Sequence, residues 1–219
     1  MNRKEQLSEL IRYCRLIHGK GLVSSSGGNV SIRIGDHIYI TPSGRSLQQI
    51  GEEDILELDL QGNYQGAIGA VPSKEWRMHL CCYQYEGIQA VVHVHSPNAV
   101  ALSCMKELDF QCSMPIYTAG CAVRVGALPV IPYLPSGSRE LAEAVSQVIG
   151  ERDSVLLENH GVLAVGKDLE QALNIIEEIE ENARVHFILG SRGKALSGEQ
   201  LANYSMGRSR GPGHVQAPV

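Results

Sequence analysis

The chain has 219 residues, 43% of them hydrophobic and 20% charged, which suits a globular protein with a sizeable core. Its net charge of −5 indicates no nucleic-acid surface, and no apolar run approaches the roughly 20 residues of a membrane helix, so we expect neither partner. The six cysteines show no Cys-x-x-Cys spacing, which favours free thiols and a cytoplasmic location.

Helices and strands alternate unevenly along the chain. The first 17 residues mix charged and apolar side chains at helical spacing, and the predicted helix ends near Gly19 because glycine suits a helix C-terminus. Further helices are predicted over 73–85, 96–105, 138–149 and 168–189, and strands over 30–34, 37–41, 55–60, 89–95, 127–133, 155–157 and 162–165. We expect one mixed α/β domain over residues 1–206 and a flexible Gly- and Pro-rich tail over 207–219.

Two histidines in the predicted strand Val91-Val92-His93-Val94-His95 carry the strongest functional signal. Side chains at i and i+2 of a strand leave the same face, so both imidazoles point one way. Neighbouring imidazoles favour a divalent transition-metal site. The alternative is a pair of polar residues on the solvent face of a strand.

Two further residues can complete such a site. A catalytic zinc takes three protein ligands, and His160 is the third candidate, in a turn where Gly161 allows a sharp change of direction. Glu75 begins a predicted helix, whose N-terminus favours a carboxylate, and is the candidate acid/base. The alternatives are an exposed turn histidine and a glutamate that only stabilises its helix.

Three short loops have the composition of anion-binding segments: residues 27–29, 41–44 and 73–74. Glycines let backbone N–H groups approach phosphate oxygens, and hydroxyl and ammonium groups add donors. Each loop can equally be an ordinary turn or helix cap.

The order of these segments resembles one known family, the class II sugar-phosphate aldolases, which also includes adducin head domains. The resemblance covers residues 5–190. It is carried by Gly-Gly-Asn-Val-Ser at 27–31, Thr-Pro-Ser-Gly at 41–44, Pro-Ser-Lys-Glu-Trp-Arg-Met-His at 72–79, Ala-Val-Val-His-Val-His-Ser at 90–96 and Leu-Leu-Glu-Asn-His-Gly-Val at 156–162.

The resemblance implies a fold and a metal site. The fold is a three-layer α/β/α sandwich on a mainly antiparallel sheet, assembled as a homotetramer with active sites at subunit interfaces. The cofactor is one divalent metal per subunit. Zinc is the metal that we expect, and manganese, cobalt or nickel are the alternatives. His93, His95 and His160 match the metal ligands. Glu75 matches the proton acceptor, which also ligates the metal when substrate is absent.

The resemblance also implies a substrate site. Its phosphate-binding positions correspond to Gly28, Asn29, Ser43, Gly44 and Ser73. Lys74 stands where some members have a second serine. Tyr117 lies in the region that supplies a catalytic tyrosine to the adjoining subunit, and Tyr204 is a candidate for the family's C-terminal tyrosine.

Several activities occur in this family. The first expectation is a metal-dependent lyase that cleaves a carbon–carbon bond of a phosphorylated ketose through a metal-stabilised enediolate, as in fuculose-phosphate aldolases. Residues 72–75 and 123–133 also resemble the branch that decarboxylates 3-oxo-tetronate 4-phosphates. The epimerase branch carries aspartate at the position of Glu75. A third alternative is a non-catalytic interaction module like the adducin head, whose members lack the metal histidines.

Overall fold

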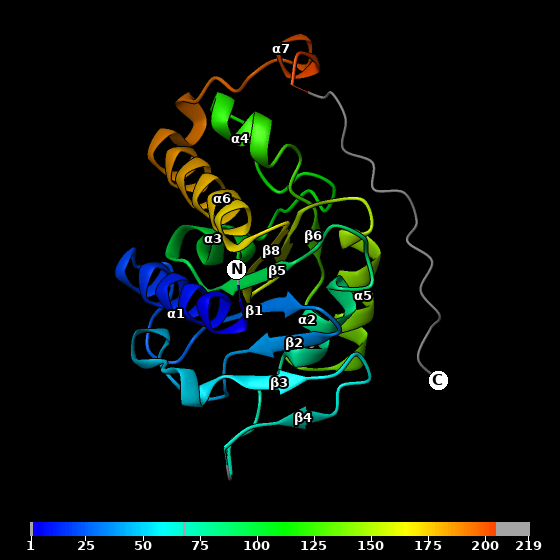
Figure 1. Cartoon of the computed structure of the whole chain (residues 1–219). Coiled ribbons are helices and arrows are strands. Elements are labelled where there is room, and N and C mark those ends of the chain that lie inside the picture. Colours follow the sequence, from blue (N-terminus) through cyan, green and yellow to red (C-terminus); the bar gives the residue numbers. More distant parts are fainter. Residues whose placement is uncertain (1, 68, 205–219) are drawn as a thin grey trace.

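The computed structural model describes residues 2–67 and 69–204, and a mixed sheet forms its centre (Figure 1). In the described part of the chain the strand order is β4-β3-β2-β1-β5-β8-β7-β6, and every pair is antiparallel except β6 with β7. The strands are β1 (Asn29–Ile34), β2 (His37–Ile40), β3 (Leu56–Leu58), β4 (Tyr64–Gln65), β5 (Ala90–Val94), β6 (Val130–Ile131), β7 (Ser154–Leu157) and β8 (Gly161–Gly166).

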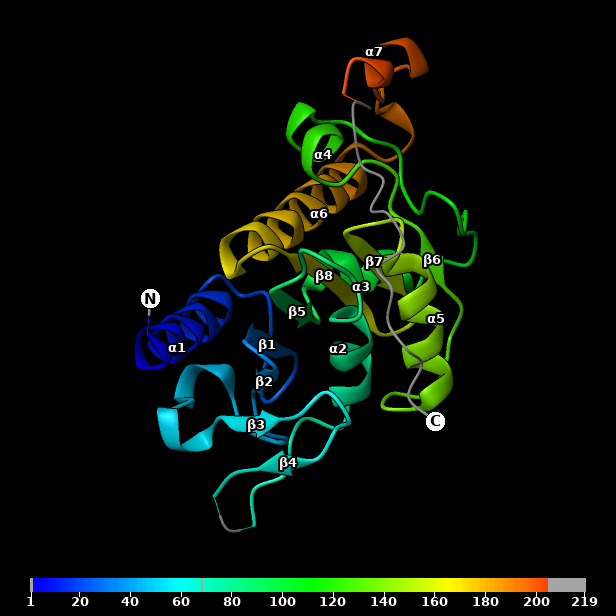
Figure 2. The same cartoon turned by 45° about the vertical axis from the view of Figure 1, so that its right-hand side comes forward.

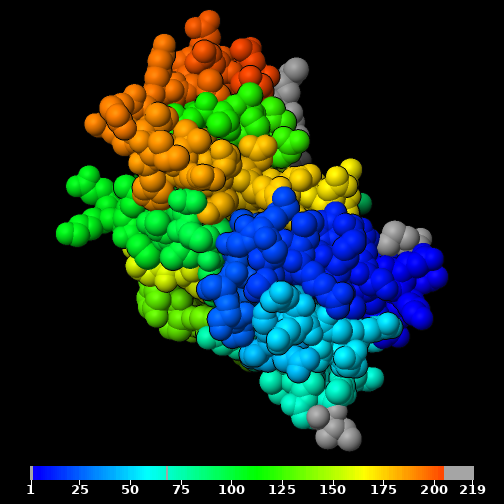
Figure 3. All heavy atoms as spheres, turned by 90° about the vertical axis from the view of Figure 1, so that its left-hand side faces the viewer, coloured from blue at the N-terminus to red at the C-terminus, as the bar shows by residue number. Residues whose placement is uncertain are grey.

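Helices cover both faces of the sheet, so the predicted three-layer architecture with a mainly antiparallel sheet is confirmed. One face packs against α1 (Arg3–Gly19), α3 (Pro97–Ser103) and α6 (Leu169–Leu189). Helices α1 and α6 lie side by side over it (Figure 3). The other face packs against α2 (Trp76–Cys82) and α5 (Arg139–Ile149), as Figure 2 shows from the side. Helix α4 (Ala119–Arg124) packs on α6, and α7 (Gly198–Ala202) follows.

The alternation of side chains decides which layer receives the histidines. Val92 and Val94 of β5 pack in the core beneath α1 and α6, whereas Val91 packs on the side of α2 and α5. His93 therefore faces α2, as the i, i+2 spacing predicts. Strand β1 is antiparallel to β5 and pairs Asn29 with His93, so Asn29 and Ser31 face the same layer.

Several predicted boundaries differ from the observed ones. The strand expected over 127–133 is reduced to β6, because Pro129 and Pro132 flank it and lack the N–H that a ladder needs. The helix expected over 73–85 is shorter, and Glu75 occupies its N-cap position. Strand β4 and helices α4 and α7 were not predicted. The tail expected over 207–219 lies outside the described residues.

Two further features concern the cysteines and the length and polarity of the helices. All six cysteines are free thiols, four of them buried and Cys104 exposed. Within the described ranges, no helix combines the length and the apolar character that crossing a membrane requires.

Candidate metal centre

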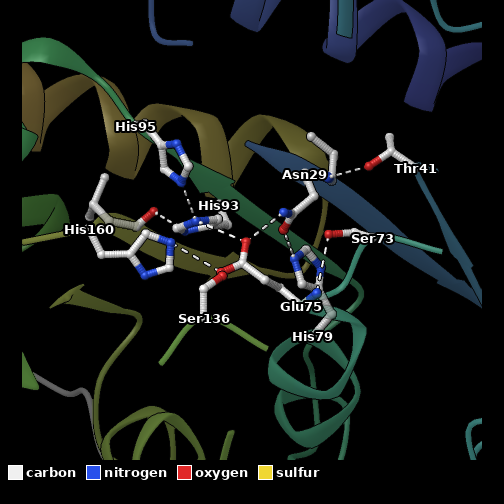
Figure 4. Close-up of polar contacts among 11 residues, drawn as sticks. Asn29, Thr41, Ser73, Glu75, His79, His93, His95, Ser136 and His160 are labelled. Atoms are coloured by element: carbon white, nitrogen blue, oxygen red, sulfur yellow. Dashed lines mark hydrogen bonds and ion pairs between the residues drawn. The ribbon is translucent and has the colours of Figure 1, made fainter. Parts of the chain in front are cut away.

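Four side chains predicted to share a metal converge at one point between β5 and α2 (Figure 4). One ligand atom from each of Glu75, His93, His95 and His160 lies within 4.8 Å of the others. Nε2 of His93 is 2.9 Å from Nε2 of His95. The carboxylate of Glu75 is 3.1 Å from Nε2 of His160 and 3.4 Å from Nε2 of His93.

The turn between β7 and β8 places His160 in this group. Its left-handed residue is Asn159, at φ 54°, a residue type that tolerates this conformation. Gly161 was expected to make the sharp turn. Its observed role is different, because its missing side chain allows β8 to lie close to Val94 and His95. A Cβ on it would lie 2.5 Å from the carbonyl oxygen of Val94 and 2.9 Å from Cδ2 of His95. A larger residue would therefore push β8 away from the histidines.

The ring of His93 is held in the form that binds a metal. Nδ1 of His93 donates to the carbonyl oxygen of Val162 over 3.0 Å, which leaves the lone pair of Nε2 directed into the cluster. Burial lowers the pKa of His93 well below its ordinary value. Burial also lowers the pKa of His95, and nearby His160 adds to that effect. Both imidazoles are therefore neutral near pH 7.

The carboxylate of Glu75 is buried and oriented by two donors. The side-chain amide of Asn29 donates to Oε2 over 2.9 Å, and the hydroxyl of Ser136 donates to Oε1 over 2.7 Å. Burial raises the pKa of Glu75, but His93 and the hydrogen bonds from His160, Ser136 and Asn29 outweigh it, so the pKa lies below its usual range. Glu75 is therefore an ionised carboxylate beside the three imidazoles.

This donor set fits a divalent transition metal. A tetrahedral zinc ion about 2.0–2.1 Å from each ligand needs ligand atoms roughly 3.4 Å apart, and three pairs of ligand atoms here lie 2.9, 3.1 and 3.4 Å apart. A Cβ on Gly27 would lie 3.0 Å from Nδ1 of His95. Glycine at this position therefore avoids a close contact with the imidazole of His95. Three imidazoles and a carboxylate suit zinc and also manganese, cobalt or nickel.

Two of the predicted phosphate loops are tied together beside the cluster. The N–H of Ser43 donates to the carbonyl oxygen of Val71 over 3.0 Å, and that of Ser73 donates to Thr41 over 3.1 Å. Gly44, with φ 74°, ends the first loop in a left-handed conformation. The hydroxyl of Ser73 accepts from the N–H of Glu75 at 3.3 Å. The loops are thus attached to the residue that begins α2.

The third loop packs directly on the histidine strand. Gly28 has φ 74°, and a Cβ there would lie 2.9 Å from the carbonyl oxygen of His93. Its neighbour Asn29 contacts Glu75 and His79 through its side chain. Lys74 is exposed next to Glu75. Binding of an anion by these loops stays a prediction.

The two predicted tyrosines lie outside this cluster. The N–H of Tyr117 donates to Asn182 over 2.9 Å and its hydroxyl lies 3.1 Å from Nδ1 of His186, both on α6. Tyr204 follows α7 and is exposed. Because the role expected of Tyr117 belongs to the site of an adjoining subunit, both roles stay predictions.

The structure adds residues that the sequence analysis missed. Ser136 contacts Glu75 from the turn before α5, and a signal existed, because its Pro-Ser pair at 135–136 repeats those at 42–43 and 72–73. His79 also lies behind the site, bonded to Asn29. Its position one helical turn after Glu75 is the signal that could have found it.

Residues 8–187 match the model of the Class II Aldolase and Adducin N-terminal domain. The chain therefore belongs to the class II aldolase and adducin family, and the resemblance stated from its sequence is confirmed.

Named relatives fall into two groups of activity. The L-fuculose phosphate aldolase of Methanococcus maripaludis strain C7 is 40% identical over 187 residues, covering 84% of this chain and 98% of the relative. The 3-oxo-tetronate 4-phosphate decarboxylase of Haemophilus influenzae is 37% identical over 182 residues, covering 82% and 86%. The crystal structure of YgbL from Klebsiella pneumoniae superposes with a TM-score of 0.88 at 30% identity, covering 93% and 99%. Family and relatives indicate a lyase, as predicted.

Proposed function

We propose that this chain is a divalent-metal-dependent lyase that cleaves a carbon–carbon bond of a phosphorylated ketose, as a fuculose-phosphate aldolase does. One observation carries the proposal: three imidazoles and a carboxylate meet beside loops suited to a phosphate. We further propose zinc as the metal, a cytoplasmic location and a homotetramer with active sites at subunit interfaces.

The residues of the site have distinct roles in this reaction. The metal, held by His93, His95 and His160, would supply Lewis-acid stabilisation of the negative charge that develops on oxygen when the bond breaks. Glu75 moves a proton to and from the three-carbon fragment, within reach of the same centre. The phosphate loops anchor the substrate and so fix its orientation. Tyr117 of an adjoining subunit exchanges a proton with the departing aldehyde.

Decarboxylation of a 3-oxo-tetronate 4-phosphate is the second candidate, and Lys74 favours it. Burial is the main cause that lowers the pKa of His95, and the ammonium group of Lys74 adds to it. We take this cation, which is exposed and directly precedes Glu75 in the chain, as the group that would hold the carboxylate that a 3-oxo acid carries in addition to its phosphate. Loss of carbon dioxide leaves the same kind of charge on oxygen, so the same residues serve.

A panel of phosphorylated ketoses and 3-oxo-4-phosphate acids, assayed separately for aldehyde and carbon dioxide, tests both candidates. The expected result is aldehyde release from one ketose phosphate, lost after chelation and restored by Zn²⁺. Carbon dioxide release alone would replace the first candidate by the second, and Lys74→Ser should then weaken binding of the 3-oxo acid. A protein that binds no metal and turns over nothing would favour an interaction module like the adducin head.

A further inference from the structure

A row of five buried polar side chains runs from the metal centre into the core between β1 and α2. Its members, in order, are Glu75, Asn29, His79, Ser31 and Tyr83. Each is 4% exposed or less. Figure 4 shows Asn29 between the imidazole of His79 and the carboxylate of Glu75. Buried polar groups of this kind are stable only when every member has its partners.

The spacing of the two elements explains the row. Glu75, His79 and Tyr83 stand at i, i+4 and i+8 along α2, and therefore share one face of the helix. Asn29 and Ser31 stand at i and i+2 of β1, and share one face of the strand. Helix and strand side chains thus alternate along the row.

Donors and acceptors along the row follow one direction. A carboxylate only accepts, so Asn29 presents its amide nitrogen to Oε2 of Glu75, 2.9 Å away, and its oxygen to His79. An amide oxygen also only accepts, so Nε2 of His79 carries the proton, and the neutral ring accepts at Nδ1. Ser31 therefore donates to Nδ1 over 2.7 Å and accepts from Tyr83, also over 2.7 Å.

We propose that His79 is a positioning residue of the metal centre, which fixes the amide of Asn29 so that its nitrogen, and not its oxygen, meets Glu75. Without the Nε2–H of His79, only the carboxylate of Glu75 still orients the amide of Asn29, and the amide oxygen loses its buried donor. The inference rests on the proposed function only in taking Glu75 as a metal ligand when no substrate is bound. Partners that orient ligands in this way affect metal affinity by about 10- to 100-fold.

Two substitutions separate this role from a merely structural one. In His79→Gln the side-chain nitrogen can occupy the place of Nε2 and donate to Asn29, whereas the acceptor for Ser31 is lost. In His79→Asn the shorter amide reaches only the place of Nδ1, so the bond to Ser31 is kept and the donor to Asn29 is lost. Each variant leaves one buried neighbour unpaired, so both should lose similar stability in urea titrations.

The affinity of the full-length protein for Co²⁺, measured by competition with a chelator, distinguishes the two variants. We expect His79→Asn to lose about 10-fold or more and His79→Gln to stay within about threefold of the native protein. Equal losses, or no loss in His79→Asn, would overturn the proposal.

Long-range ¹⁵N–¹H spectra of the metal-free native protein give a readout that needs neither metal nor substrate. The proposal requires the proton of His79 on Nε2 and none on Nδ1, and a proton on Nδ1 would overturn it. Should the native protein bind no Co²⁺ and cleave no substrate, the proposed function fails, while these spectra still decide the direction of the hydrogen-bonded row.

Discussion

His93 donates from Nδ1 to the carbonyl oxygen of Val162 on the neighbouring strand β8, over 3.0 Å. Since the backbone oxygen can only accept, this bond decides which ring nitrogen is left for a metal. The ring of His93 is fully buried, so it has little freedom to choose another arrangement. The geometry of the centre therefore begins in the pairing of β5 with β8.

Replacement of this histidine tests the metal assignment. His93→Ala removes the ligand whose lone pair is already directed into the cluster, so bound metal and turnover should be lost together. Elemental analysis of the purified protein measures the first and the ketose-phosphate assay the second. His37→Ala, at a half-exposed histidine paired with Glu57, is the matched control and should keep both. Full metal content in His93→Ala would disprove the ligand assignment.

Glu75→Gln tests the proton transfer. The amide is nearly isosteric with the carboxylate but cannot accept a proton, so kcat should fall by about 10²–10⁴-fold, with the fold and phosphate binding kept. Steady-state kinetics with the substrate found in the panel, and binding of inorganic phosphate, measure the two properties. Glu57→Gln on the outer strand β3 serves as the control. A rate equal to that of the native protein would remove Glu75 from the mechanism.

Gly161→Ala tests whether space at the β7–β8 turn is required. The added methyl group would lie 2.5 Å from a backbone oxygen of β5, which cannot move without shifting the strand. We expect a loss of about 1–3 kcal/mol in the free energy of unfolding and weaker metal binding. Gly198→Ala, where a Cβ would meet nothing within 4 Å, should leave both unchanged. Similar behaviour of the two variants in urea denaturation would contradict the packing argument.

The burial of His79 predicts a pH dependence of stability. Burial lowers its pKa to about 4, and the opposing effect of Glu75 does not offset this. Between pH 6.5 and 4 the unfolded chain therefore binds a proton that the folded protein does not. This contribution to stability is complete above pH 6.5 and is lost as the pH falls, on the order of 3 kcal/mol by pH 4.

Urea denaturation of the metal-free protein at several pH values measures this contribution, with His79→Gln as the comparison. The variant should be less stable than the native protein at pH 7, and the difference should shrink as the pH falls toward 4. A difference that is constant or grows over this range would show that His79 does not remain neutral in the fold. His93 and His95 are present in both proteins and cancel in the comparison.

Much of the metal site was predictable because it depends on local periodicity. The alternation of β5 places His93 on one face and Val92 and Val94 on the other, as the run of valines indicates. His95 follows directly after the strand and turns toward His93. A short turn between two apolar strands likewise brings His160 to the start of β8. Periodicity could not show that Glu75 lies beside these histidines. Only the resemblance to the family indicated that the four residues share one site.

The residues that were missed depend on contacts between distant segments. Asn29 was expected only at a phosphate, yet its side chain joins Glu75 to His79 because β1 pairs with β5 in that register. Ser136 lies in an ordinary-looking turn and reaches Glu75 only because α5 packs against α2. The role expected of Tyr117 concerns the site of an adjoining subunit and stays a prediction.

The buried row between β1 and α2 also constrains how the sheet can assemble. Side chains alternate along a strand, so a one-residue slip of β1 against β5 would turn Asn29 and Ser31 into the apolar layer under α6. His79 would then keep no partner for either ring nitrogen, and a misaligned chain would bury several orphaned donors and acceptors at once. The polar groups behind the metal ligands therefore select the correct strand alignment during folding, whatever substrate the finished protein acts on.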